Sequence, residues 1–441
     1  MATLSPTTAD PLSVPRSRAD AQLSNIDWTL DRVACWSLTA ALVFLMGADF
    51  RGDTGEEFQV HWQIYLRLLL AAVAGGVGAL LLFPKTYRDF FCVPGILLVG
   101  YAGWYLATLP FSVAKGYSIA AWVSLVGVLL FIPAAMRILG GFRLVTAVAT
   151  GLVAFLLGSW FAYLFVPEIG VFNEQITRTE VFERMGGLGH PNELGMYAAF
   201  TTVLFAGLGV SRRVGWSLAI LGMMLGLVTL VGCFSRTSMA VCLVGLAVTL
   251  QGQWRLRSNL AGISLGVGLA SFVLLAAFGT GQLDWLIEDA LRKVTKTGNT
   301  DELATATGRT EIWSYAVTQI AESPLYGYGY CSARFIMEEH SYHCHNIVLN
   351  AMMFGGIVAG LIVATMIAYL VWGILFNPRP EIDGLAAILV TGGMVEGLLG
   401  APSPAAAIFL WVMLIFWRQL NMQIATQTTE APERSPAYSM Q

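Results

Sequence analysis

Three histidines lie just ahead of an apolar stretch in the last quarter of the chain. The segment EEHSYHCHN places His340, His343 and His345 within six positions, and the chain holds five histidines in all. An imidazole can act as a general base near neutral pH because its ordinary pKa is about 6.5. A helix that begins directly after His345 would hold this residue at a fixed depth. We therefore predict His345 as a candidate base and interpret His340 and His343 as solvated loop residues.

Arginines beside apolar stretches are the second group that could do chemistry. In CFSRTSM, Arg236 stands between two apolar runs with Ser235 and Thr237 on either side. If those runs cross a membrane, a charge there is expensive and is a functional candidate by default. We interpret this segment as an anion-binding corner; in the alternative interpretation, Arg236 extends to lipid headgroups. Arg67, in WQIYLRLLL, could extend outward or line a cavity, and the sequence leaves both open.

Arg309 stands at a predicted helix start in TATGRTEIWSYA. A threonine can cap this helix, and Glu311 falls in its first turn, where the helix dipole favours an acid. Backbone N–H groups and a guanidinium at a helix start suit a phosphate. The alternative is a solvated arginine that pairs with Glu302 or Glu311.

A glycine-rich segment, ERMGGLGHPNELG, places His190 and Asn192 at the start of another apolar run. Pro191 suits the first position of a helix, and the glycines permit another group to approach the backbone closely. His190 and Asn192 are therefore candidates for contact with a ligand, although His190 as an ordinary loop residue is the simpler interpretation.

Two of the six cysteines are near the histidines: Cys331 precedes them, and Cys344 lies between His343 and His345. In an oxidising compartment they could form a disulfide that closes a short loop, and two thiols are the alternative. The segment HSYHCH lacks the second cluster that a zinc site needs, so we predict no metal.

The composition indicates which elements position these residues. The chain has 441 residues, of which 56% are hydrophobic and 12% charged. Soluble domains carry about 25% charged residues, so most of this chain must have lipid as its solvent. The net charge of −3 argues against a nucleic-acid partner, which would need a basic face.

The fold class that we predict is an all-α polytopic integral membrane protein with about 12 transmembrane helices and a long, partly helical periplasmic loop. A span needs about 20 apolar residues. Residues 27–280 would hold the first nine spans, 281–345 the loop, and 346–422 the last three, between disordered cytoplasmic tails at 1–26 and 423–441. The candidate spans are 33–50, 62–83, 90–110, 117–138, 142–165, 191–210, 214–233, 236–253, 259–280, 346–375, 384–400 and 403–420.

Loop charge sets the expected orientation. With the N-terminus inside, every inner loop carries at least one lysine or arginine, whereas the short outer loop DFRGDTGEEF is acidic. Both termini are then cytoplasmic. The two long loops, 166–190 and 281–345, fall outside, and loops of this length are usually functional.

Four motifs together resemble the O-antigen ligase and polymerase superfamily of bacterial inner-membrane glycosyltransferases. They are GLGHPNELG, SRTSM, TGRTEIW and HNIVLNAMMFGGIVAG, and they lie in order between about residues 180 and 360. The last is the most specific, because family members carry His-Asn and a glycine eleven residues after the histidine, here His345, Asn346 and Gly356. Two positions depart from the pattern: Ala359 precedes Gly360, and Ala240 stands where some ligases have leucine.

The resemblance implies a GT-C-like enzyme that needs no metal or other cofactor. The donor would be a glycan on undecaprenyl pyrophosphate, and the acceptor a lipid A–core hydroxyl or another lipid-linked glycan, at the periplasmic face of the inner membrane. His345 would be the base. Arg236 and Arg309, followed by Arg184 and Arg67, would neutralise the pyrophosphate. Substrate contacts of lesser weight would come from His190, Asn192, His343 and Asn346.

Several activities stay open at this level. A ligase is favoured because the histidine of the His-Asn motif suits it, whereas many polymerases of O-antigen or exopolysaccharide repeats rely on arginines. A protein O-glycosylating enzyme is disfavoured by the short C-terminal tail. From another class, a transporter or flippase of lipid-linked sugars would place charges near mid-membrane and show two matching halves.

Overall fold

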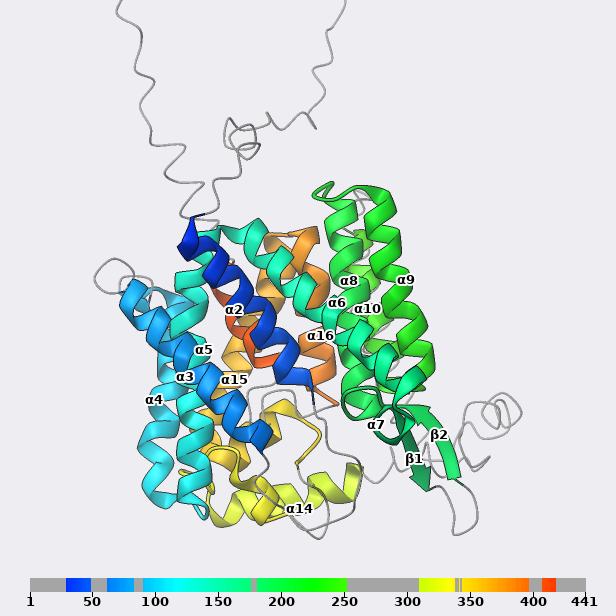
Figure 1. Cartoon of the computed structure of the whole chain (residues 1–441). Helices are drawn as coiled ribbons and strands as arrows, with labels where there is room; N and C mark the ends of the chain where they lie inside the picture. Colours follow the sequence, from blue (N-terminus) through cyan, green and yellow to red (C-terminus); the bar gives the residue numbers. More distant parts are fainter. Residues whose placement is uncertain are drawn as a thin grey trace, which may run out of the picture.

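A computed structural model describes residues 29–48, 62–82, 90–175, 181–251, 309–337, 341, 343–395 and 407–417. This part of the chain is a bundle of long helices with one small hairpin (Figure 1). Eight of its helices are long and apolar enough to cross a membrane. The prediction of an all-α polytopic membrane protein is therefore confirmed.

The helices follow the predicted spans closely in the first half of the chain. Their bounds are α2 (Leu30–Gly47), α3 (Trp62–Leu82), α4 (Val93–Thr108), α5 (Lys115–Leu139), α6 (Gly141–Phe165), α8 (Pro191–Val210), α9 (Trp216–Cys233) and α10 (Arg236–Gln251), with a 3-10 turn η3 (Leu109–Phe111) after α4. The described part of helix α10 is shorter than a full span, and the chain after Gln251 lies outside the described residues.

The second half adds α14 (Arg309–Glu322), the 3-10 turn η5 (Ser332–Phe335), α15 (Ile347–Phe376), α16 (Pro380–Gly393) and a helical segment at Ala407–Trp417. Helix α16 begins four residues before the predicted span 384–400. The predicted span 259–280 and both tails lie outside the described residues, so the count of twelve spans stays a prediction.

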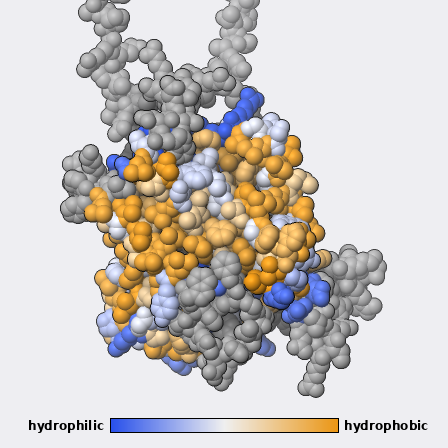
Figure 2. Space-filling model, viewed as in Figure 1, coloured by the Kyte–Doolittle hydropathy of each residue, from blue (hydrophilic) through white to orange (hydrophobic). Residues whose placement is uncertain are grey.

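Helix α8 is the centre of the bundle. Every residue from Leu194 to Val210 is buried, whereas neighbouring α9 leaves apolar side chains such as Leu221 and Val231 exposed. Apolar side chains cover the middle of the face seen in Figure 2, and hydrophilic ones lie toward its ends. Exposed apolar area of this extent is unusual for a soluble protein and is expected where lipid is the solvent.

The loop predicted at 166–190 contains structure that the sequence analysis missed. A short helix α7 (Pro167–Gly170) leads into an antiparallel hairpin of β1 (Val171–Gln175) and β2 (Val181–Met185). Each strand begins with Val-Phe, residue types that are enriched in strands, but neither VFNEQ nor VFERM alternates apolar and polar residues, so the strand signal is weak. The hairpin and α14 lie at the same end of the bundle (Figure 1), which we call the loop end.

Candidate functional site

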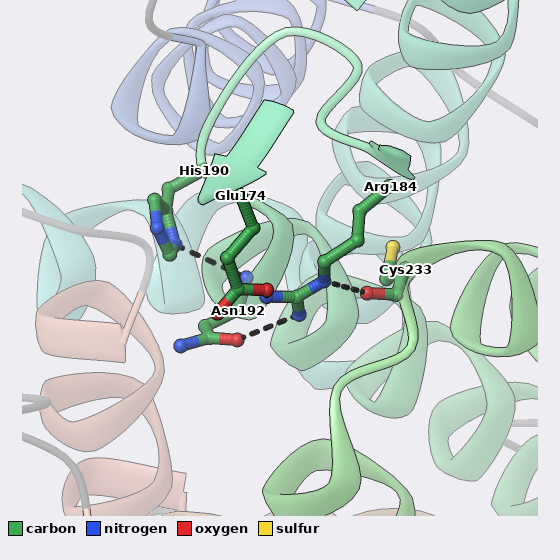
Figure 3. Close-up of polar contacts among 5 residues, drawn as sticks. All are labelled: Glu174, Arg184, His190, Asn192 and Cys233. Atoms are coloured by element: carbon green, nitrogen blue, oxygen red, sulfur yellow. Dashed lines mark hydrogen bonds and ion pairs between the residues drawn. The ribbon is translucent and has the colours of Figure 1, made fainter. Parts of the chain in front are cut away.

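Arg184 on β2 is the centre of a polar cluster at the loop end (Figure 3). Its Nε donates to the carbonyl oxygen of Cys233 at 2.8 Å, Nη1 to Oε2 of Glu174 at 2.9 Å, and Nη2 to Oδ1 of Asn192 at 3.0 Å. Only 4% of Arg184 is exposed. We call these four residues the arginine latch, because one side chain joins the hairpin to α8 and α9.

The register of the hairpin explains the ion pair of the latch. Phe172 pairs with Arg184, so Glu174, two residues further along β1, is on the same face as Arg184 and diagonal to it. The salt bridge between Arg184 and Glu174 follows from this geometry. The prediction that Arg184 binds pyrophosphate is left as a prediction, and the three contacts within the protein favour a structural role.

His190 begins α8 as its cap. Its Nδ1 accepts a hydrogen bond from the backbone N–H of Asn192 at 3.2 Å, and its ring packs edge-on against Phe172 at 4.8 Å between centroids. Because Nδ1 accepts, the neutral ring carries its proton on Nε2. The residue is exposed, and Pro191 takes the first helical position as predicted.

Arg236 is the first residue of α10 and follows Cys233 of the latch by three positions. Phe234 turns the chain from α9 into α10 with a left-handed backbone, φ 49°. Ser238 Oγ donates to the carbonyl oxygen of Asn192 at 3.3 Å, and a Cβ on Gly195 would lie 2.8 Å from Cβ of Ser235. The glycine-rich motif and SRTSM, distant in sequence, therefore meet where α8 and α10 begin.

Arg67 contacts the other side of the same region. Its guanidinium donates to the carbonyl oxygen of Ala48, the residue that ends α2. A Cβ on Gly189 would lie 3.1 Å from the carbonyl oxygen of Gly47, so the end of α2 adjoins the residue before His190. This contact caps a helix C-terminus with a cation, a favourable arrangement.

The predicted base, His345, lies in a tight turn that we call the histidine turn, residues 343–346. His345 has a left-handed backbone with φ 48°, which is uncommon for a residue other than glycine. Its N–H donates to Nδ1 of His343 at 3.2 Å, and the two rings are 4.0 Å apart between centroids. Both residues are half-buried.

Cys344, the residue just before His345, is held through both of its main-chain polar groups. Trp313 on α14 donates its indole N–H to the carbonyl oxygen of Cys344 at 2.8 Å. The N–H of Cys344 donates to Oδ1 of Asn350 on α15 at 2.9 Å. Neither Trp313 nor Asn350 was predicted as a site residue, although they lie within the motifs TGRTEIW and HNIVLN.

Asn346 caps α15. Its Oδ1 accepts from the N–H groups of Val348 at 3.0 Å and Leu349 at 3.1 Å, while Nδ2 donates to the carbonyl oxygen of Met394 at 3.3 Å. Both polar atoms of the Asn346 side chain therefore make hydrogen bonds within the protein, and Oδ1 caps the helix.

Arg309 is the first residue of α14, one helical turn before Trp313. The contact between Trp313 and Cys344 therefore brings the start of α14 to the histidine turn. Arg309 is the first described residue of this helix, and the prediction that it stands at the helix start stays a prediction.

Helix α15 is broken one third of the way along, at Gly355 and Gly356. The turn-rich segment PLYGYGY, residues 324–330, docks onto the break: Tyr328 N donates to Met353 O at 2.8 Å, and Ile357 N to Pro324 O at 2.8 Å. A Cβ on Gly356 would lie 2.2 Å from Leu325 O. The glycine eleven residues after His345 is thus required by backbone contact with the loop.

The disulfide considered between Cys331 and Cys344 is not present. Both are buried thiols among the described residues. The Cys344 thiol contacts Sδ of Met337 at 3.4 Å, and burial raises its pKa to about 12. Burial also raises the pKa of the Cys331 thiol.

Helix α16 packs against both α8 and α15. Its Gly384 packs where a Cβ would lie 2.3 Å from Val203 on α8, and its Gly393 packs against Ile347, the first residue of α15. The predicted residues therefore form two groups at the loop end: Arg67, Arg184, His190, Asn192 and Arg236 in one, and Arg309, His343, His345 and Asn346 in the other. His340 and the side chain of Arg309 lie outside what the structure describes.

Within the described part of the chain, no group of three or more histidine, cysteine or acidic residues could hold a metal ion. Compared with known families, residues 221–364 match the family described as O-Antigen ligase. This segment includes Arg236, Arg309, Trp313, His345 and Asn350. The comparison with curated proteins finds no match.

Proposed function

We propose that the chain is an O-antigen ligase, on the premise that its residues 221–364 match the family described as O-Antigen ligase. It would transfer a glycan from undecaprenyl pyrophosphate to a hydroxyl of a lipid A–core acceptor. The loop end would face the periplasm of a bacterial inner membrane, with both termini in the cytoplasm.

One observation carries the proposal. The histidine turn and the start of α14 are joined by the bond from Trp313 to Cys344, so a candidate base and a candidate pyrophosphate ligand, His345 and Arg309, come from adjacent segments. A base and a cationic group near one another are what a metal-free displacement at an anomeric carbon needs.

The proposed reaction is a single displacement. An acceptor oxygen forms a bond to the anomeric carbon as the bond from that carbon to the pyrophosphate oxygen breaks, which inverts the configuration. His345 takes the acceptor proton, and Arg309 and Arg236 receive the negative charge that develops on the departing undecaprenyl pyrophosphate. Arginine suits this task because its planar fork can bind two phosphate oxygens at once.

The first test is His345→Ala in the full chain reconstituted in proteoliposomes with an undecaprenyl pyrophosphate-linked glycan and lipid A–core. General-base catalysis is worth about 10²–10⁴-fold, so we expect a rate loss in that range. The assay is the appearance of glycan-modified lipid on a gel. Transfer at the normal rate would remove His345 from the mechanism.

The acceptor separates the ligase from the polymerase. Omitting lipid A–core should stop product formation by a ligase. Longer glycans that appear on the undecaprenyl carrier without lipid A–core would instead identify a polymerase.

A further inference from the structure

The turn that holds His345 depends on two residues outside the turn. We propose that Trp313 and Asn350 are positioning residues that set where the His345 imidazole lies. This inference rests on the proposed role of His345 as the base. Neither side chain is assigned to substrate.

Two hydrogen bonds support the proposal, and both involve main-chain atoms of Cys344. Trp313 Nε1 binds the carbonyl oxygen of Cys344 at 2.8 Å, and Asn350 Oδ1 binds the N–H of Cys344 at 2.9 Å. Residue 344 is therefore held from α14 on one side and from α15 on the other. Because Cys344 is held, the orientation of His345, which follows it, is fixed as well.

The backbone of His345 explains why such support is needed. Its φ of 48° is a conformation that L-residues other than glycine adopt at a cost, so it persists only where surrounding contacts impose it. Trp313 and Asn350 supply those contacts from two different helices. Without them, the turn would relax toward an ordinary backbone and the imidazole would move.

The atom of Asn350 that holds the turn is its side-chain oxygen, Oδ1. The residue is 1% exposed, and its Nδ2 has no hydrogen-bond partner in the described part of the chain. A buried amide usually has its polar atoms paired. The bond from Oδ1 to Cys344 is thus the interaction that accounts for a polar side chain at this buried position of α15.

The kinetic experiment uses Trp313→Phe and Asn350→Leu, each of which removes one hydrogen bond and puts an apolar side chain of comparable size in its place. We expect kcat to fall about 10- to 100-fold, since small displacements of a catalytic group have effects of this order. KM for the lipid-linked donor should stay within about twofold, because neither residue contacts substrate. The matched control is Trp122→Phe, which removes an indole bond of the same kind, to Ala102 O at 2.7 Å, away from the turn.

A double-variant measurement separates positioning from general loss of structure. Trp313→Phe should have no further effect on the residual rate of His345→Ala, because it acts through His345. A further fall of tenfold in that background would overturn the proposal.

A readout independent of activity uses the buried thiol of Cys344. Trp313→Phe and Asn350→Leu should raise the rate at which a small maleimide labels Cys344, measured by mass spectrometry of the labelled peptide, and Trp122→Phe should not. Increased labelling together with normal transfer by His345→Ala would mean that the turn is held as described but that the proposed function is wrong. Unchanged labelling and unchanged kcat in both variants would overturn the positioning role itself.

Discussion

The arginine latch and the histidine turn lie at the same end of the molecule but are built in opposite ways. In the latch, the side chain of Arg184 makes the contacts, and its three nitrogens all donate within the protein. In the histidine turn, the bonds that hold the peptide before His345 run through main-chain atoms of Cys344. One region uses a functional group to hold structure, and the other holds a functional group by its backbone.

This difference separates two residues that the sequence presented as partners in one site. A guanidinium that is 4% exposed and engaged at three nitrogens has little capacity for a pyrophosphate. A histidine whose backbone is held by neighbours can place its ring for chemistry. Charge and residue type alone do not distinguish a structural arginine from a catalytic one, whereas the list of hydrogen-bond partners does.

Arg184→Ala should have the largest effect of the variants that test this comparison, and the effect is on the free energy of unfolding. Removing one partner of a buried ion pair costs about 3–5 kcal/mol. The Glu174 side chain keeps 30% exposure, so we expect a loss of about 3 kcal/mol in the free energy of unfolding in detergent. Glu174→Gln is the matched control, because its amide oxygen still accepts from Nη1. We expect that variant to lose about 1 kcal/mol.

A stable Arg184→Ala protein that has lost transfer at every donor concentration would break the comparison. Arg184 would then belong with the pyrophosphate ligands.

The next largest effect concerns the break in α15, onto which residues 324–330 dock. Gly356→Ala places a Cβ 2.2 Å from Leu325 O, at a residue with φ 67°. Strain at such a backbone and an overlap in a packed interior each cost about 1–3 kcal/mol. Taking the lower end of each, we expect a loss of about 2 kcal/mol in the free energy of unfolding.

Gly360→Ala, one turn further along α15, is the control for this variant, because its Cβ would meet the flexible Met352 side chain. Equal stability of the two variants, measured by thermal unfolding, would show that the loop does not depend on the break in α15.

A smaller effect is expected from Arg309→Lys, which keeps the charge and loses the fork. A hydrogen bond to a charged group is worth about 1.5–3 kcal/mol, which corresponds to about 10- to 100-fold in rate. We expect kcat to fall by that factor with stability unchanged, the reverse of the Arg184→Ala result. Near-normal transfer by this variant would argue that no pyrophosphate oxygen pair is bound there.

No effect is expected from a chelator. If guanidinium groups receive the leaving pyrophosphate, EDTA should leave the transfer rate of the purified enzyme unchanged. Inhibition that a divalent ion reverses would show that a metal shares this task.

The helices were predictable because the apolar runs are long and continuous. The predicted span 191–210 and helix α8 have the same bounds, and the predicted span 346–375 differs from α15 by one residue at each end. The hairpin was missed because two five-residue strands give a weak signal beside twenty-residue apolar runs. The position of Trp313 was also beyond prediction, because its contact with Cys344 joins residues 31 positions apart.

Composition alone determined that lipid is the solvent for this chain, because so few charges cannot cover a soluble protein of this size. Residue type and spacing also singled out His345 and the glycine eleven residues later. Only the tertiary structure decided which polar groups are engaged with the protein, because hydrogen bonds depend on the approach of helices that are distant in sequence. It placed Arg184 in a latch and set Trp313 and Asn350 around the peptide that carries His345.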